Sequence, residues 1–144
     1  YELLLENIKL NNITNIIPFN CAVSQNSSKV KIFLNDDQSS HSMFIPNSES
    51  IEVPSISVHD IFKENEIKKC DLLKLDCEGA EYDIIKSIEL EHFEFINKIA
   101  IEYHFADSKP DLLEELIKKL KKSFNQITTR ELFSDIGFLF AKRK

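Results

Sequence analysis

The 144-residue sequence has a formal net charge of −6, with 42% hydrophobic and 29% charged residues. This composition is ordinary for a globular protein, and the length suits one domain with a substantial core. The acidic charge argues against a general nucleic-acid surface, and no apolar run approaches the roughly 20 residues of a membrane-spanning helix. We therefore expect a cytoplasmic protein without a membrane span or a nucleic-acid partner.

The cysteines indicate a reducing environment. Cys21, Cys70 and Cys77 are odd in number, widely spaced and without a C-x-x-C pair. This pattern favours free thiols over a disulfide framework. Because the ligand spacing of a zinc site is also missing, we assign no metal-binding residues.

The first third of the chain predicts a helix, two strands and a loop. "YELLLENIKLNN" has apolar residues at helical spacing and ends in asparagines, which favour a helix stop. Residues 15–24 have the composition of a strand, and residues 29–34 alternate like a strand with one solvated face. The Ser-rich residues 35–50 have no period and predict a long loop. Since the chain opens in mid-helix and without Met, we expect it to be a segment of a longer protein.

The remainder alternates strands with helices. Residues 51–57 predict a strand in which Pro54 marks an edge or a bulge. Ser57 and Asp60 form an S-x-x-D capping box for a helix at residues 58–66. There follow a strand at 71–75, a helix at 81–93, a strand at 97–105, a helix at 109–124, and strand-like runs at 124–132 and 136–144. This order predicts an α/β domain whose sheet is mostly parallel, with an antiparallel C-terminal strand pair.

Candidate functional residues follow three of the predicted strands. In an open α/β sheet, ligands bind at the carboxyl ends of the strands. These ends carry Asn20, Cys21 and Ala22; Asp76, Cys77, Glu78 and Gly79; and Glu102, Tyr103 and His104. Crowded acids can bind a divalent cation, shift one pKa upward to act as a base, or orient a hydroxyl. A histidine is suited to general-base catalysis near neutral pH.

Each of these residues also has a structural interpretation. Asp76 could cap the following helix, and Gly79 could serve only to permit a tight turn. We expect Glu81 to be solvated or paired with a lysine, and Cys77 to be a packing residue rather than a nucleophile. A single histidine after a strand, such as His104, is more often structural than catalytic.

The longest motif closely resembles a known family. "VPSISVHDIFKENEIKKCDLLKLDCEGAEYDII", followed by "KIAIEYH", is similar to the FkbM family of S-adenosylmethionine-dependent methyltransferases, which shows "DLLKIDVEGAE" and a strand ending near "EYH". "ENIKLNNITNIIPFNCAVS" resembles the family segment before it. The match keeps its order over nearly the whole chain, and Cys77 stands where valine is common.

The resemblance implies a Rossmann-like class I methyltransferase sheet and methyl transfer from S-adenosylmethionine, usually to a hydroxyl of a small molecule, sugar or lipid. It implies a cofactor site formed by Asn20, Cys21, Ala22 and Asp76. Asp76 would orient the acceptor hydroxyl or hold a cation such as Mg²⁺, to which we do not commit, while Glu102 or His104 would take the proton. The excursion at residues 24–55 would cover or select the acceptor.

One family feature is missing from the chain. Such enzymes bind the methionine end of the cofactor with a glycine-rich loop after the first strand, whereas glycine occurs here only at positions 79 and 137. We therefore interpret residues 1–144 as a single partial methyltransferase domain that lacks the first two strands. Because unpaired buried backbone groups cost about 1–3 kcal/mol each, we expect the rest of a longer polypeptide to supply those strands, and this chain alone to be inactive.

Two other functions remain as alternatives. The chain could be a non-catalytic α/β binding module derived from the same fold, in which the acids cap helices or bind a partner. An aspartate phosphoacceptor of receiver type would fit "LLKLD" at a strand end. It is disfavoured because the chain shows no acidic pair after a first strand and no suitable lysine near its end.

Overall fold

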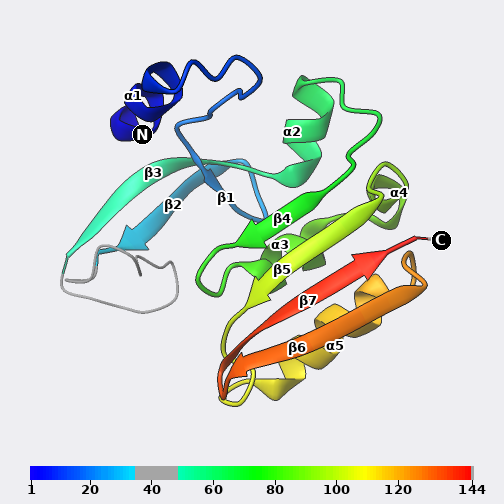
Figure 1. The fold of residues 1–144 in the computed structure, drawn as a ribbon. Helices are drawn as coiled ribbons and strands as arrows, with labels where there is room; N and C mark the ends of the chain where they lie inside the picture. The colour runs from blue at the N-terminus through cyan, green and yellow to red at the C-terminus, as the bar shows by residue number, and fades with distance from the viewer. Residues whose placement is uncertain (35–48, 144) are drawn as a thin grey trace.

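The computed structural model describes residues 1–34 and 49–143, so residues 35–48 of the expected loop lie outside the described residues. The chain forms two β-sheets and several helices, as shown in Figure 1, and the α/β prediction is confirmed. The helices are α1 (Glu2–Leu10), α2 (Val58–Glu64), α3 (Glu81–Ser87), α4 (Leu90–Phe93) and α5 (Pro110–Leu120). The strands are β1 (Ala22–Val23), β2 (Ser28–Phe33), β3 (Ser50–Ile56), β4 (Leu73–Asp76), β5 (Lys98–Tyr103), β6 (Gln126–Phe133) and β7 (Ile136–Lys142).

The larger sheet has the strand order β4-β5-β7-β6. β4 and β5 run parallel, and helices α3 and α4 form the crossover between them. β7 pairs antiparallel with both β5 and β6. The predicted antiparallel C-terminal strand pair is therefore confirmed.

The smaller sheet has the order β1-β3-β2, with β1 parallel and β2 antiparallel to β3. Pro54 lies in the central strand β3, but β1 pairs only with Ser55 and Ile56. At Pro54 the strand therefore has a neighbour on the β2 side alone, which is the local edge that a residue without a backbone N–H requires. α2 follows β3, and the Ser57 hydroxyl accepts a hydrogen bond from the Asp60 backbone N–H, as the capping motif predicts.

Three expectations about the elements are wrong. Among the described residues two of the five strand pairings are parallel, so the sheet is not mostly parallel. Of the strand predicted at residues 15–24 only Ala22–Val23 forms, since within the described part of the chain residues 15–19 have no strand to pair with. The helix predicted at residues 81–93 is interrupted at Ile88, which is extended, and the Ser87 hydroxyl bonds the Ile84 carbonyl in place of further helix.

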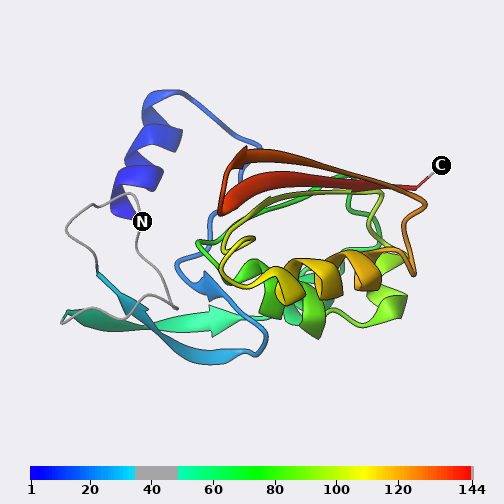
Figure 2. The same cartoon turned by 90° about the horizontal axis from the view of Figure 1, so that it is seen from below.

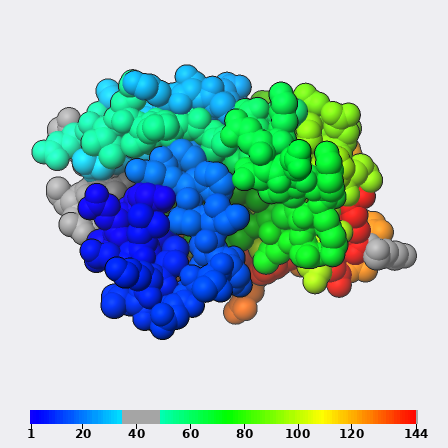
Figure 3. All heavy atoms as spheres, turned by 90° about the horizontal axis from the view of Figure 1, so that it is seen from above, coloured from blue at the N-terminus to red at the C-terminus, as the bar shows by residue number. Residues whose placement is uncertain are grey.

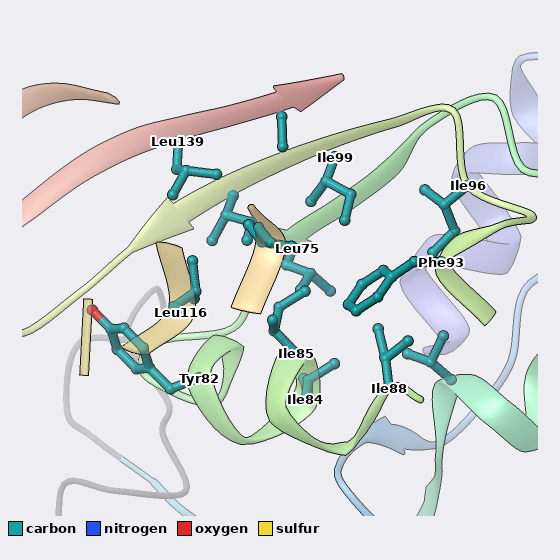
Figure 4. Close-up of a cluster of buried hydrophobic side chains, with 14 of the residues drawn as sticks. Leu75, Tyr82, Ile84, Ile85, Ile88, Phe93, Ile96, Ile99, Leu116 and Leu139 are labelled. Carbon is teal, nitrogen blue, oxygen red and sulfur yellow. The ribbon is translucent and has the colours of Figure 1, made fainter. Parts of the chain in front are cut away.

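The hydrophobic core lies between the larger sheet and its helices. Figure 2 shows α3 and α5 together on one face of this sheet. Their inward side chains meet those of the strands in the cluster drawn in Figure 4. Ile85 of α3 faces Leu75 of the sheet, and both belong to one buried cluster with Ile84, Ile99 and Leu139, in which each of these residues is at most 4% exposed. This packing fixes α3 against β4 and β5, and so fixes the turn that joins β4 to α3.

Helix α1 stands apart from this core. None of its residues is buried, and Leu3 and Leu10 are each about three-quarters exposed. In the space-filling view of Figure 3, α1 (dark blue) lies at one side of the face and the residues around β4 and α2 (green) at the other. Over the described residues, no helix combines the length and apolar character needed to cross a membrane.

Candidate functional site

The parallel pairing of β4 and β5 brings two of the predicted acids together. Asp76, the last residue of β4, pairs directly with Glu102, the penultimate residue of β5. Side chains at such paired positions point to the same face of the sheet. The Asp76 side chain is 39% exposed. It forms an ion pair with Lys74, in which Nζ of Lys74 lies 2.9 Å from Oδ2 of Asp76. This hydrogen bond and the charge of Asp76 raise the pKa of Lys74.

The turn between β4 and α3 has an unusual backbone. Glu78 and Gly79 have φ angles of 51° and 106°, in the backbone region that residues other than glycine rarely adopt. A Cβ atom on Gly79 would lie 2.4 Å from Cε2 of Phe105, so glycine is required both for its conformation and for space. The α3 N-cap is Ala80, without a side-chain capping bond, so the alternative in which Asp76 caps this helix is wrong.

A buried glutamate–histidine pair follows this turn. Glu81, in the first turn of α3, is fully buried, and its Oε1 lies 2.5 Å from Nδ1 of His104, which follows β5. The expectation that Glu81 is solvated or paired with a lysine is therefore wrong. On the other edge of the imidazole, Nε2 of His104 lies 3.6 Å from Oε2 of Glu78. The imidazole is thus held between two carboxylates, one buried and one partly exposed.

This environment sets the protonation of His104. The hydrogen bond that the imidazole donates to Glu81 raises the pKa of His104 above its ordinary value of 6.5, and the charges of Glu81, Glu78 and Glu102 act in the same direction. Burial of the imidazole opposes them. The net effect favours the imidazolium form, because a positive charge among carboxylates is stabilised more than desolvation penalises it.

A hollow of about 180 Å³ adjoins the end of β4. Its lining residues are Ala22, Val23, Ile32, Asp76, Cys77, Glu78 and Ala80. Typical ligand pockets measure roughly 300–1,000 Å³, so this hollow can accommodate part of a ligand of that size. Two larger hollows, of about 390 and 600 Å³, border α5 and include none of the strand-end acids.

The sequence-predicted residues are only partly assembled. One ligand atom from each of Asp76, Glu102 and His104 lies within 4.8 Å of the others, a spacing that would suit a cation. However, Asp76 already pairs with Lys74 and His104 with Glu81, so we assign no metal ligands. His104 and Glu102 do not line the hollow beside Asp76.

Only some of the proposed cofactor-binding residues line the hollow. Ala22 lies in β1 and lines the hollow, whereas Asn20 and Cys21 precede this strand and do not contact the hollow. Burial raises the pKa of the Cys77 thiol, which keeps it in the neutral form. This agrees with a packing role for Cys77.

Two residues of the site, Glu78 and Glu81, were not assigned a catalytic or cofactor-binding role from the sequence. Glu78 lines the hollow, and Glu81 holds the histidine. The signal that could have identified them is the E-G-x-E spacing, because a turn at the glycine brings its two glutamates to the same side. Sequence alone could not show that the partner of both is His104, which lies 23 residues beyond Glu81.

Comparison with known proteins identifies similarity to methyltransferases in each match. The family model described as the methyltransferase FkbM domain matches residues 1–130. "Methyltransferase 1" of Beauveria bassiana (strain ARSEF 2860) is 40% identical over 45 residues, which are 31% of this chain and 17% of that protein. "Methyltransferase sdnD" of Sordaria araneosa is 39% identical over 36 residues, which are 25% of this chain and 14% of that protein. The matched segments thus span less than a fifth of these curated relatives, and no solved structure matches the chain.

Proposed function

Because the chain belongs to the FkbM methyltransferase family, we propose that the protein transfers a methyl group from S-adenosylmethionine to a hydroxyl of a small molecule, sugar or lipid. The observation that carries this proposal is the convergence of Asp76, Glu102 and His104 at the adjacent ends of β4 and β5. Such a group of acids and an imidazole can orient a hydroxyl and accept its proton.

The residues around the hollow fit one end of this cofactor. Asp76 and Glu78 place carboxylates where a sulfonium would be stabilised by opposite charge, and Val23 and Ile32 offer apolar surface. Ala22 would contact the cofactor from the β1 side. When bound, S-adenosylmethionine supplies an electrophilic methyl group.

The chain's own contribution is mainly positional. In the transfer, the acceptor oxygen bonds the methyl carbon while the carbon–sulfur bond breaks and its electron pair stays on sulfur. The protein holds the two reactants close and in line, which lowers the entropic part of the barrier. Asp76 would orient the acceptor hydroxyl, and a neighbouring base at this end of the sheet would take its proton.

We also propose that further strands, supplied by the rest of a longer polypeptide, pair with β1 and β4. In the described sheets β1 and β4 each stand at an edge. Exposed apolar side chains lie near these edges, including Ile17 at 78% and Leu72 at 56% exposure. An uncovered apolar strand edge is normally protected by pairing, which is the support for this proposal.

The decisive experiment replaces Asp76 by asparagine in the protein that carries this chain. Isothermal titration calorimetry measures S-adenosylmethionine binding, and a methyl-transfer assay with hydroxylated acceptors measures turnover. We expect a loss of turnover for Asp76→Asn, with Asp111→Asn, an exposed substitution on α5, as the matched control. Wild-type turnover by Asp76→Asn would refute its role, and failure of the wild type to bind the cofactor would favour the non-catalytic binding module.

A further inference from the structure

The residue that accepts the proton can be selected by its position. This inference rests on the proposed methyl transfer and deepens it. We infer that Glu78 is the catalytic carboxylate facing the acceptor hydroxyl, and that the buried Glu81–His104 pair is the device that positions it. Neither Glu102 nor His104 then acts as the base.

Access separates Glu78 from the other two candidates. Glu78 lines the hollow beside Asp76, and 33% of its side chain is exposed. The His104 side chain is only 8% exposed, and neither His104 nor Glu102 lines the hollow. A general base must come within hydrogen-bond reach of the proton that it removes. Of the three, Glu78 meets this requirement.

The backbone of Glu78 is held in a conformation that is uncommon for a glutamate. Its φ of 51° is in the left-handed region, which asparagine, aspartate and glycine adopt more readily than glutamate. Such conformations persist where surrounding structure over-determines them, and they concentrate at functional sites. Gly79 follows at φ 106°, packed against Phe105, so the turn cannot relax without moving that ring. From this turn Glu78 lines the hollow and has its Oε2 3.6 Å from Nε2 of His104.

The charges of the Glu81–His104 pair are suited to hold the Glu78 carboxylate in place. Oε1 of Glu81 lies 2.5 Å from Nδ1 of His104, and Nε2 of His104 lies 3.6 Å from Oε2 of Glu78. Asp76 on β4 and Glu102 beside it on β5 also have a carboxylate oxygen within 4.8 Å of a ring nitrogen of His104, and Lys74 pairs with Asp76. The hydrogen bond to Glu81 and the charges of Glu81, Glu78 and Glu102 raise the pKa of His104. An imidazolium donates from both nitrogens and has no lone pair to accept a proton, so it serves to orient Glu78 rather than to act as the base.

The chemical step then balances as follows. The acceptor oxygen forms its bond to the methyl carbon, the carbon–sulfur bond breaks, and the electron pair remains on sulfur. The hydroxyl proton passes to a carboxylate oxygen of Glu78. His104 keeps its proton throughout and stabilises the Glu78 carboxylate before the transfer.

The pH dependence of turnover distinguishes the two assignments without any mutation. If His104 positions Glu78 as an imidazolium, kcat falls as the pH rises through the raised pKa of His104, above about 6.5. If His104 is the base, it must be neutral, and kcat rises over the same range. A rising profile above pH 6.5 would therefore overturn the inference.

Matched variants give a second test. Glu78→Gln removes the charge at constant size, and we expect kcat to fall about 100-fold, the lower bound for losing a general base, with little change in cofactor binding. Glu81→Gln should lower kcat less and also shift the pH profile, whereas exposed Glu114→Gln on α5 should match the wild type. Glu78→Asp keeps the charge in a residue suited to positive φ, and we expect it to recover part of the activity. Turnover at the wild-type level in folded Glu78→Gln would contradict the inference.

A readout independent of catalysis separates this inference from the proposed function. Imidazole NMR resonances report the pKa of His104 in the folded protein, with or without an acceptor. We expect this pKa to lie above 6.5 and to fall in both Glu78→Gln and Glu81→Gln. If the wild type transfers no methyl group, the proposed function fails. An unchanged His104 pKa in Glu78→Gln would overturn the inference itself.

Discussion

The substitution Gly79→Ala tests the turn that carries the site. The turn places Glu78 between the hollow and His104, and it depends on Gly79 in two separate ways. The backbone has φ of 106°, and the added methyl group would lie 2.4 Å from Cε2 and 3.2 Å from Cδ2 of Phe105. Both effects act on the folded state, so the substitution should lower the free energy of unfolding.

The magnitude follows from these two contributions. Holding a residue other than glycine in a sparsely populated backbone region costs about 1–3 kcal/mol. Forcing an extra carbon into a packed contact costs about 1–3 kcal/mol, because the neighbouring side chain must leave its preferred rotamer. We therefore expect Gly79→Ala to destabilise the protein by about 2–6 kcal/mol, a large part of the roughly 5–15 kcal/mol available to a typical domain.

A double-mutant cycle measured by urea unfolding separates the two contributions. Phe105→Ala removes the ring that the new methyl group would meet, while the backbone conformation at position 79 still opposes alanine. The double variant should therefore lose less stability than the sum of the two single variants, by roughly the steric part. Circular dichroism and the m-value check that each variant unfolds in one transition with similar exposed surface.

Two results would refute this reasoning. A loss below about 1 kcal/mol for Gly79→Ala would mean that neither the positive φ nor the contact with Phe105 constrains the turn. Strict additivity in the cycle would mean that the ring and the methyl group do not meet, and the close approach described here would be wrong.

Further predictions concern the core and the histidine. Ile84→Ala removes most of a fully buried side chain and should lower the free energy of unfolding by about 2–5 kcal/mol. As a control, Ile51→Ala at an exposed position should change it by no more than about 0.5 kcal/mol in the same urea experiment. Equal losses in the two variants would contradict the core assignment. His104 has a raised pKa, so its contribution is fully present below the unfolded value near 6.5 and is lost as the pH rises through the folded value. The free energy of unfolding should fall above pH 6.5 in the wild type and change less in His104→Gln; a parallel decline in both would count against the Glu81–His104 pair.

The sequence predicted the elements whose signals are local. The spacing of apolar residues located α5, the S-x-x-D pattern located the start of α2, and the alternating C-terminal runs located the β6–β7 pair. Asp76 and Glu102 could also be selected from the sequence, because an acid that follows an apolar run is a local feature. Their direct pairing follows from β4 and β5 lying side by side.

What could not be predicted depends on contacts between distant parts of the chain. The helix stops before Ile88, which is buried in the core, although helix propensity alone continues to residue 93. The burial of Glu81 could not be predicted from the neighbouring residues, because a glutamate on a helix is usually solvated. Here the hydrogen bond with His104 offsets the cost of removing the carboxylate from water. The burial of His104 likewise depends on residues distant in the sequence.

The two residues that begin α3 are both tied to the residue that follows β5. Glu81 bonds the imidazole of His104, and the Tyr82 hydroxyl donates to the backbone carbonyl of the same histidine. The start of the helix and the end of the strand therefore cannot separate one at a time. Amide hydrogen exchange in these two segments should occur through a single cooperative opening, so the geometry around Glu78 is either wholly present or wholly lost.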